Sequence, residues 1–294
     1  EEDKQFEELK KSKFKQLKLP AWRPVPTVIS TAIIFCAFGV VFIVFGVILL
    51  IYSNKIEEVK VRYDDKCEKD NPECEIEITV DNEMKPPVMF YYQLDGFYQN
   101  HRMYVKSRND DQLNGKSFSK GEMEDDGGCD PIITNKDIGD LAAKNYLDGD
   151  PLNPDDLAIP CGLIAKSFFT DFYDMADDKD NEVEIDDEDI AWPADKSKFK
   201  NVDLKKQWMD MENEHFIVWM RPAGLTNFRK LYGRIHDTLL GKYKITISNP
   251  SDKLYDVSPY KGKKYIVLST ANAFGGKNYL LAYSYIVVGA LAIL

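Results

Sequence analysis

Residues 24–54 read PVPTVISTAIIFCAFGVVFIVFGVILLIYSN and contain no Asp, Glu, Lys or Arg. A helix crosses the apolar core of a bilayer with roughly 20 apolar residues, so this stretch is long enough to span a membrane. It exceeds the apolar core of a signal peptide, and no small-residue cleavage pattern follows it. We therefore expect a cytoplasmic tail over residues 1–24 and a transmembrane helix over residues 25–53.

A second uncharged stretch, NYLLAYSYIVVGALAIL, occupies residues 278–294. As a helix it would be about 25 Å long, slightly less than the apolar thickness of a bilayer. We therefore expect an incomplete second transmembrane helix that continues beyond Leu294. Residues 54–277, here called the ectodomain, must then lie together on one side of the membrane.

Basic side chains near the first span predict its orientation. Lys and Arg close to a span favour the cytoplasmic side, and the tail is rich in them: Lys10, Lys11, Lys13, Lys15, Lys18 and Arg23. Both termini are therefore predicted to be cytoplasmic and the ectodomain to be lumenal or extracellular. The tail carries +2 and the spans are uncharged, so the ectodomain carries −13 of the total net charge of −11 (−11 − 2 = −13). This charge disfavours nucleic acid as a partner.

The cysteines agree with an oxidising compartment. Cys36 lies inside the first span, whereas Cys67, Cys74, Cys129 and Cys161 all lie in the ectodomain. An even number of cysteines outside the cytoplasm indicates two disulfides. Three connectivities are open, of which pairing between sequence neighbours is the simplest. A zinc site is disfavoured because no C-x-x-C spacing occurs.

Short strand patterns recur along the ectodomain. Residues 74–80, CEIEITV, alternate apolar and polar side chains as a half-buried strand does. Further short aromatic or β-branched runs also predict strands: 88–92, 216–220, 243–247 and 265–269. Residues 228–236 could form a short basic helix, and residues 115–156 are predicted to be a long loop clipped by a disulfide. The expected ectodomain is β-rich, an antiparallel sandwich-like fold with long loops.

Motifs for catalysis are missing. The sequence contains no G-x-x-x-x-G-K-[ST], no H-E-x-x-H and no G-x-S-x-G motif. The three histidines do not lie at metal-ligand spacing, and the carboxylate-rich run at residues 171–189 fits no EF-hand register, so we interpret it as a solvated acidic loop. The Asp-Lys-Thr-Gly-Thr motif of ion and lipid pumps is also absent. We expect no enzyme activity, no cofactor and no metal, and any transport role must act through another chain.

Six segments, in order from residue 14 onward, resemble the accessory (β) subunits of type-four P-type ATPases, the phospholipid flippases. This family is named for cell-division-control protein fifty and ligand-effect modulator three. The segments are FKQLKLPAWRPVPT (14–27), FYYQLDGFYQNHRMYVKSRNDDQLNG (90–115), PCGLIAKSFF (160–169), IAWPADKSKFKN (190–201), NEHFIVWMRPAGLTNFRKLYGRI (213–235) and YIVLSTANAFGGKNYLLAYSYIVVG (265–289).

The resemblance implies two membrane helices around a disulfide-containing, β-rich ectodomain. It also implies a one-to-one complex with the catalytic subunit of such an ATPase, in contact with membrane lipids. It further implies that the accessory chain acts as a chaperone, needed for the stability of the ATPase and its exit from the endoplasmic reticulum, and that it supports phospholipid translocation to the cytoplasmic leaflet. The location would be the endoplasmic reticulum, Golgi, endosomes or plasma membrane.

The sequence departs from the family pattern at several positions. No N-x-[ST] glycosylation sequon occurs. The paired tryptophans of relatives are reduced to Trp192-Pro193, and the tryptophan expected before Gly-Gly-Lys-Asn is Phe274. An extra turn-former, Pro222-Ala223-Gly224, stands where relatives place proline later. These changes put local loop contacts in doubt.

Small residues in the two spans predict close helix packing. Ala32, Gly39 and Gly46 recur every seven residues in the first span, and Ala282 and Gly289 do so in the second. Small residues let membrane helices approach closely. These stripes are expected to face each other or a partner helix, so Gly39 and Gly46 are candidate partner contacts; small residues are also simply common in such helices.

Two further segments are candidate partner contacts. In the tail, LPAWRPVP is too rich in proline for a regular helix; Trp22 could anchor in lipid headgroups and Arg23 could reach an acidic partner, or both could serve as a plain membrane anchor. In the ectodomain, residues 91–108 are rich in tyrosine and arginine, which are enriched at interface hot spots. Tyr91, Phe97 and Tyr104 could equally be core residues. The ectodomain candidates are Tyr91, Tyr98, Arg102, Tyr104 and Arg108.

Two other functional classes share this topology. A two-span ligand-gated channel or sensor subunit also has a large disulfide-bonded ectodomain, but the first span offers only Thr27, Ser30 and Thr31 as polar residues near its cytoplasmic end. A membrane-tethered lumenal enzyme would need the nucleophile or metal motifs that the sequence lacks. Stoichiometry separates the classes, because a channel self-assembles whereas an accessory subunit binds one large ATPase.

Overall fold

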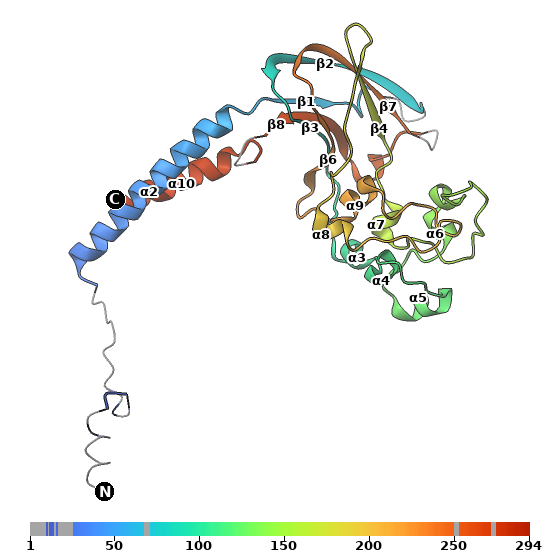
Figure 1. The fold of residues 1–294 in the computed structure, drawn as a ribbon, viewed down its shortest axis with the longest axis horizontal. Coiled ribbons are helices and arrows are strands. Elements are labelled where there is room, and N and C mark those ends of the chain that lie inside the picture. The colour runs from blue at the N-terminus through green and yellow to red at the C-terminus, as the bar shows by residue number, and fades with distance from the viewer. Residues whose placement is uncertain are drawn as a thin grey trace. The chain divides into compact units, whose positions relative to one another are not determined.

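The computed structural model describes residues 10, 12–14, 16, 26–67, 71–249, 253–271 and 275–294. The chain divides into two compact units (Figure 1). The first is formed by Glu1–Ile51 and Asn278–Leu294, and the second is Tyr52–Lys277. The first unit contains two apolar helices, and the strands of the described chain all belong to the second.

Helix α2, Val28–Asn54, is the only helix among the described residues that is long and apolar enough to cross a membrane. Thr27 and Ser30 stabilise its start: the Ser30 backbone N–H donates to Thr27 Oγ1 at 3.2 Å, and the Thr27 N–H donates to Ser30 Oγ at 3.0 Å. Helix α10, Tyr279–Ile293, is also apolar, but its 15 residues are fewer than a span needs. The second membrane span is therefore supported by composition and not by length.

The predicted small-residue stripes meet inside the first unit. A Cβ atom added at Gly39 would lie 2.7 Å from the Gly289 carbonyl oxygen, and one added at Gly46 would lie 3.0 Å from the Ala282 carbonyl oxygen. Neighbouring rings also touch: Phe42 meets Tyr285 edge-on, with ring centroids 5.7 Å apart. Glycine therefore allows the α2 and α10 backbones to approach this closely. The prediction that the stripes face each other is confirmed, while a contact of the same glycines with a partner helix stays a prediction.

The second unit contains two four-stranded sheets in which all strand pairs are antiparallel, as predicted for a β-rich domain. One sheet has the order β1-β8-β3-β6 and the other β2-β7-β4-β5. The strands are β1 Glu58–Arg62, β2 Glu73–Met84, β3 Val88–Asp95, β4 Phe172–Asp177, β5 Glu182–Val183, β6 Asn227–Ile235, β7 Leu239–Ser248 and β8 Lys263–Thr270.

The two sheets share one core. Phe90 on β3 lies 5.3 Å from Tyr173 on β4, and Tyr173 lies 4.9 Å from Tyr232 on β6, measured between ring centroids. Along β2 the side chains alternate, so that Ile76 and Ile78 are buried between exposed polar residues. Aromatic contacts between the sheets thus make the sandwich that the alternation predicts.

Three local predictions were wrong. Residues 171–189 were expected to be a solvated acidic loop but include β4 and β5, and Asp171 is buried. Residues 216–220 were expected to be a strand but belong to helix α9, Glu214–Met220, whose first turn is capped by Asn213 accepting from the Phe216 N–H at 3.2 Å. A run of five apolar residues fits a buried helix turn as well as a strand. Residues 228–236 were expected to be helical but form most of β6, where Phe228, Lys230 and Tyr232 alternate toward the interior.

Short helices fill the long connections. The 3-10 helices are η1 Asp140–Ala142 and η2 Ser258–Tyr260, and the α-helices outside the first unit, besides α9, are α3 Arg102–Lys106, α4 Asp110–Leu113, α5 Lys120–Asp126, α6 Asn135–Ile138, α7 Leu163–Lys166 and α8 Pro193–Lys196. The disulfides join Cys67 to Cys74 and Cys129 to Cys161, each with a Cα–Cα distance of 5.7 Å. Sequence neighbours are therefore paired. The second bridge encloses α6 and η1 and so clips the predicted long loop of residues 115–156, in which α5, α6 and η1 are short helices.

Candidate interaction site

The five ectodomain residues predicted to contact a partner lie at different depths. Tyr98 is 59% exposed, and Arg102 is also on the surface. Tyr91 on β3, Tyr104 on α3 and Arg108 are partly buried. The exposed pair remains open to a partner, whereas the other three already have intramolecular neighbours.

Tyr104 is mainly a packing residue. Its ring lies edge-on to the buried Phe97 with centroids 6.0 Å apart, and its hydroxyl lies 2.7 Å from Ser167 Oγ. Burial raises the pKa of the Tyr104 phenol. The interpretation of Phe97 and Tyr104 as core residues therefore fits their surroundings.

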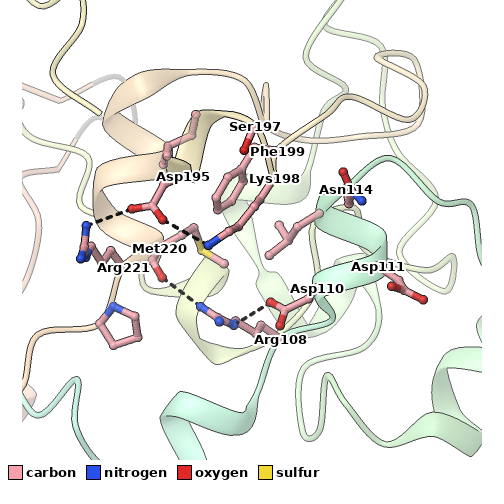
Figure 2. A pocket seen from close by; sticks show the side chains of 13 residues that line it. Arg108, Asp110, Asp111, Asn114, Asp195, Ser197, Lys198, Phe199, Met220 and Arg221 are labelled. Atoms are coloured by element: carbon pink, nitrogen blue, oxygen red, sulfur yellow. Dashed lines mark hydrogen bonds and ion pairs between the residues drawn. The ribbon is translucent and has the colours of Figure 1, made fainter. Parts of the chain in front are cut away.

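Arg108 lines a pocket of about 470 Å³ between α4, α8 and α9 (Figure 2). Its buried lining is apolar and comes from Leu113, Ile217 and Met220, which are 4%, 3% and 1% exposed. The Arg108 guanidinium donates to the Met220 carbonyl oxygen at 3.3 Å. This contact ties the segment before α4 to the end of α9 and so fixes one wall of the pocket.

Paired charges surround this apolar floor. Arg108 lies 2.9 Å from Asp110, and Arg221 lies 3.2 Å from Asp195 (Figure 2). Lys198 lies 3.6 Å from the other oxygen of Asp195. Because each of these cations has a carboxylate partner, the pocket offers an apolar floor inside a nearly neutral polar rim.

A second pocket of about 440 Å³ shares a wall with the first. Asp195, Ile217 and Arg221 line both pockets. Trp192 is 66% exposed at the second pocket, and the Arg221 guanidinium carbon lies 5.1 Å from the centre of its ring. An exposed tryptophan stacked by an arginine is a composition enriched in protein interfaces.

Lys230 contacts the C-terminal end of α9, the helix that lines both pockets. Its ammonium group donates to the carbonyl oxygens of Val218, at 2.9 Å, and of Arg221. A cation at the C-terminal carbonyls of a helix satisfies groups that have no helical partner. Burial, together with the charge of Arg221, lowers the pKa of Lys230 to about 7.

An ion pair spans the outer face of the first sheet beside the second pocket. Arg229 on β6 donates to both carboxylate oxygens of Glu58 on β1, at 2.8 and 2.9 Å, and to Gln93 on β3 at 2.9 Å. Strands β1 and β6 are the two edges of that sheet. The hydrogen bond from Arg229 holds the pKa of the Glu58 carboxyl below its usual value. Three strands are thereby joined by side chains as well as by backbone.

These arrangements suit binding of another polypeptide more than chemistry on a substrate. An apolar floor inside a rim of paired charges is the form of a protein-interface pocket, in which the rim excludes water. Within the described parts of the chain, no group of three or more His, Cys, Asp or Glu residues is placed to hold a metal ion.

Residues 49–294 match the model of the LEM3 (ligand-effect modulator 3) family / CDC50 family. The chain belongs to the LEM3/CDC50 family. The resemblance inferred from its six segments is thereby confirmed.

Several proteins are similar along three quarters of this chain or more. "Putative ALA-interacting subunit 4" of Arabidopsis thaliana is 36% identical over 96% of this chain and 85% of that protein. "Cell cycle control protein 50A" of Mus musculus is 33% identical over 96% of this chain and 85% of that protein. "Phospholipid-transporting ATPase accessory subunit CDC50" of Chaetomium thermophilum is 28% identical over 75% of this chain and 57% of that protein.

Sequence reasoning missed part of the site. Trp22 and Arg23, predicted partner contacts in the tail, lie outside the described residues. Trp192 and Arg221 were not among the predicted site residues, although Trp192 was noted as a departure from the LEM3/CDC50 pattern. A tryptophan beside proline in an otherwise polar segment is a usable signal, because an exposed tryptophan needs a reason. Asp195, which lines both pockets, has no such signal.

Proposed function

We propose that this chain is the non-catalytic accessory subunit of a phospholipid-transporting P-type ATPase and forms a one-to-one heterodimer with its catalytic subunit. The observation that carries the proposal is the family match over residues 49–294, together with relatives named as accessory and interacting subunits. Such a subunit hydrolyses no ATP, so the chain is not itself an enzyme. The alternative of a two-span channel or sensor is not favoured by these relatives.

The same proposal includes a topology. The tail of residues 1–24 and the C-terminus lie in the cytoplasm, residues 25–53 and the segment from residue 278 cross the membrane, and residues 54–277 are lumenal or extracellular. Two disulfides in the second unit support an oxidising compartment for it. Contact of the ATPase catalytic subunit with the ectodomain and the spans would stabilise the complex. It would also permit exit of the complex from the endoplasmic reticulum and assist phospholipid translocation to the cytoplasmic leaflet.

The first test is affinity purification of the full chain from native membranes in mild detergent, with mass spectrometry of the proteins that co-purify. We expect one multi-span P-type ATPase in near-equimolar amount and phospholipid-stimulated ATP hydrolysis in the pool. Recovery of a homo-oligomer without an ATPase would refute the proposal.

A matched pair of variants then tests the interaction site. Trp192→Ala removes an exposed ring from the lining of the second pocket, whereas Tyr146→Ala removes an exposed ring elsewhere; the two side chains are 66% and 50% exposed. If the pockets contact the ATPase, only the first variant lowers the co-purified amount. Equal recovery with both variants would place the partner on another surface.

A further inference from the structure

An acidic segment of the ectodomain is fastened to the edge of the first sheet. Residues 185–191, here called the strap, follow β5 and lead to α8. Asp186 and Arg234 exchange backbone hydrogen bonds, with N–O distances of 2.8 and 2.7 Å. A Cβ atom added at Gly233 would lie 2.9 Å from the Asp186 carbonyl oxygen. The strap therefore lies directly on the end of β6, and glycine there makes the close approach possible.

Side chains from β6 and α9 hold the rest of the strap. The Arg234 guanidinium donates to the carbonyl oxygens of Glu188 and Asp189, at 3.0 Å each. The Glu214 carboxylate, in the first turn of α9, accepts from the backbone N–H groups of Asp189 at 3.1 Å and Ala191 at 2.8 Å. These contacts do not depend on any group that titrates near neutral pH.

Two histidines complete the attachment, and they differ in burial. His236 Nε2 lies 2.9 Å from Asp186, and the His236 side chain is 65% exposed. His215 Nε2 lies 3.0 Å from Asp187, but the His215 side chain is only 14% exposed. The His215 ring also packs against the Tyr232 ring, with centroids 4.6 Å apart. Only His215 must therefore change its solvation to carry a charge.

Burial lowers the pKa of His215 below that of a free imidazole, and the carboxylates facing it offset this only in part. Those charged groups are Asp187 on the strap and Glu214 on its own helix. The phenol of Tyr232, across from it on β6, stays neutral because burial raises its pKa to about 12. A strap that opens would expose His215 to water, where it takes up a proton more readily. Acid therefore favours the open form.

We propose that the strap is an acid-sensitive latch, which leaves α9 and the end of β6 when His215 takes up a proton. The strap continues into Trp192 and α8, and α9 lines both pockets. Opening it would displace the wall between the pockets, so a surface formed at neutral pH is remodelled in an acidic compartment. This inference stands on the contacts of the strap and does not require the proposed function.

The expected size of the effect follows from proton linkage. An open strap with an ordinary imidazole pKa of about 6.5 gains roughly a tenfold population between pH 7.5 and pH 5.5, if the closed strap binds no proton. Amide hydrogen exchange of the full chain in detergent, measured at both pH values and expressed as protection factors, reports this change. Protection of strap amides should fall by up to about tenfold at pH 5.5, while that of β2 amides stays constant.

Three variants separate His215 from its surroundings. His215→Gln should keep a hydrogen bond toward Asp187 and abolish the pH response of the strap. His236→Gln, the same change at the exposed histidine, should leave the response intact. Asp187→Asn should leave the onset of the response unchanged but enlarge it and extend it to lower pH, because the carboxylate favours the charged imidazole only in the closed strap. This variant also serves as the test if the first does not fold.

Several outcomes would overturn the inference. These are equal strap protection at both pH values in the natural chain, an unchanged response in His215→Gln, and loss of the response in His236→Gln. A smaller response in Asp187→Asn would also overturn it. So would a response shared equally by β2, because that would mark loosening of the whole domain and not local opening of the strap.

Discussion

Asp171 is the most demanding position in the ectodomain, because a charge is buried there completely. Its side chain is 0% exposed and lies 2.7 Å from the Lys264 ammonium, which is 4% exposed. The same oxygen accepts from the Tyr63 hydroxyl at 2.9 Å, and the other oxygen accepts from the Asn249 amide at 3.2 Å and the Tyr255 N–H at 2.6 Å. Four donors thus converge on one carboxylate from four separate segments.

Asp171→Asn should strongly destabilise the ectodomain. The substitution keeps the shape of the side chain but leaves Lys264 as a buried charge with no counter-charge, and it turns an NH₂ group toward donors. Removing one partner of a buried ion pair typically costs about 3–5 kcal/mol. For a domain of this size each kcal/mol lowers the melting temperature by roughly 2–4 °C, so we expect a loss of roughly 6–20 °C.

The assay is thermal unfolding of the full chain in detergent, followed by tryptophan fluorescence. Trp208 and Trp219 report on the same unit because they are 5% and 0% exposed. Asp174→Asn is the matched control: it is the same change on the neighbouring strand β4, but at an exposed side chain. Its effect should stay within about 0.5 kcal/mol.

The reasoning has a second check in the double variant. Combining Asp171→Asn with Lys264→Met removes the stranded charge, so part of the lost stability should return. An Asp171→Asn variant that melts within about 2 °C of the natural chain, a shift of under 1 kcal/mol, would refute the argument. A double variant that melts lower than the single one would refute it as well, since the cost would then not come from the unpaired lysine.

Three further predictions concern the helix pair, the second disulfide and the sheet-spanning ion pair. Gly39→Leu should separate α2 from α10, broadening the distance distribution between spin labels on the two helices, whereas Val40→Leu, at a side chain that is 55% exposed, should not. Replacing Cys129 and Cys161 by Ala should lower stability by about 2–5 kcal/mol, and a melting curve that equals that of the oxidised natural chain would contradict this. Glu58→Gln should lower the melting temperature at pH 7. Because the folded-state pKa of Glu58 lies below its unfolded value, the contribution is present above about pH 4.5 and is lost as pH falls through the lowered pKa; the difference between variant and natural chain should therefore shrink in acid, and a constant difference would argue against it.

Local patterns in the sequence were sufficient to predict an element where each residue's environment depends on its neighbours along the chain. The uncharged run at residues 24–54 predicts α2 because length and apolarity alone decide whether a helix suits a bilayer. Alternation along residues 74–80 likewise predicts β2, since a strand presents successive side chains to opposite faces. Motif order was enough for the family, which the match over residues 49–294 confirms.

The same kind of reasoning failed where packing decided the structure. The apolar run at residues 216–220 forms part of α9, which packs against α7, α8 and β6. Residues 228–235 belong to β6, in which Phe228, Lys230 and Tyr232 are buried at every second position. The predicted contact Tyr104 is engaged with its own chain. Arg221, which was not predicted, lies in the wall between the two pockets and stacks on Trp192, which lines the second. Depth below the surface, which a sequence does not contain, separates these cases.

The sequence by itself therefore determined the apolar first helix, the β-rich character of the second unit, the family and the lack of catalytic motifs, because each rests on composition or on short-range spacing. Only the tertiary structure decided which distant residues meet. Glu58 and Arg229 stand 171 positions apart and Asp171 and Lys264 stand 93 apart. Such pairs form because two sheets and their connections bring the side chains within hydrogen-bond distance, and a buried charge then requires its partner.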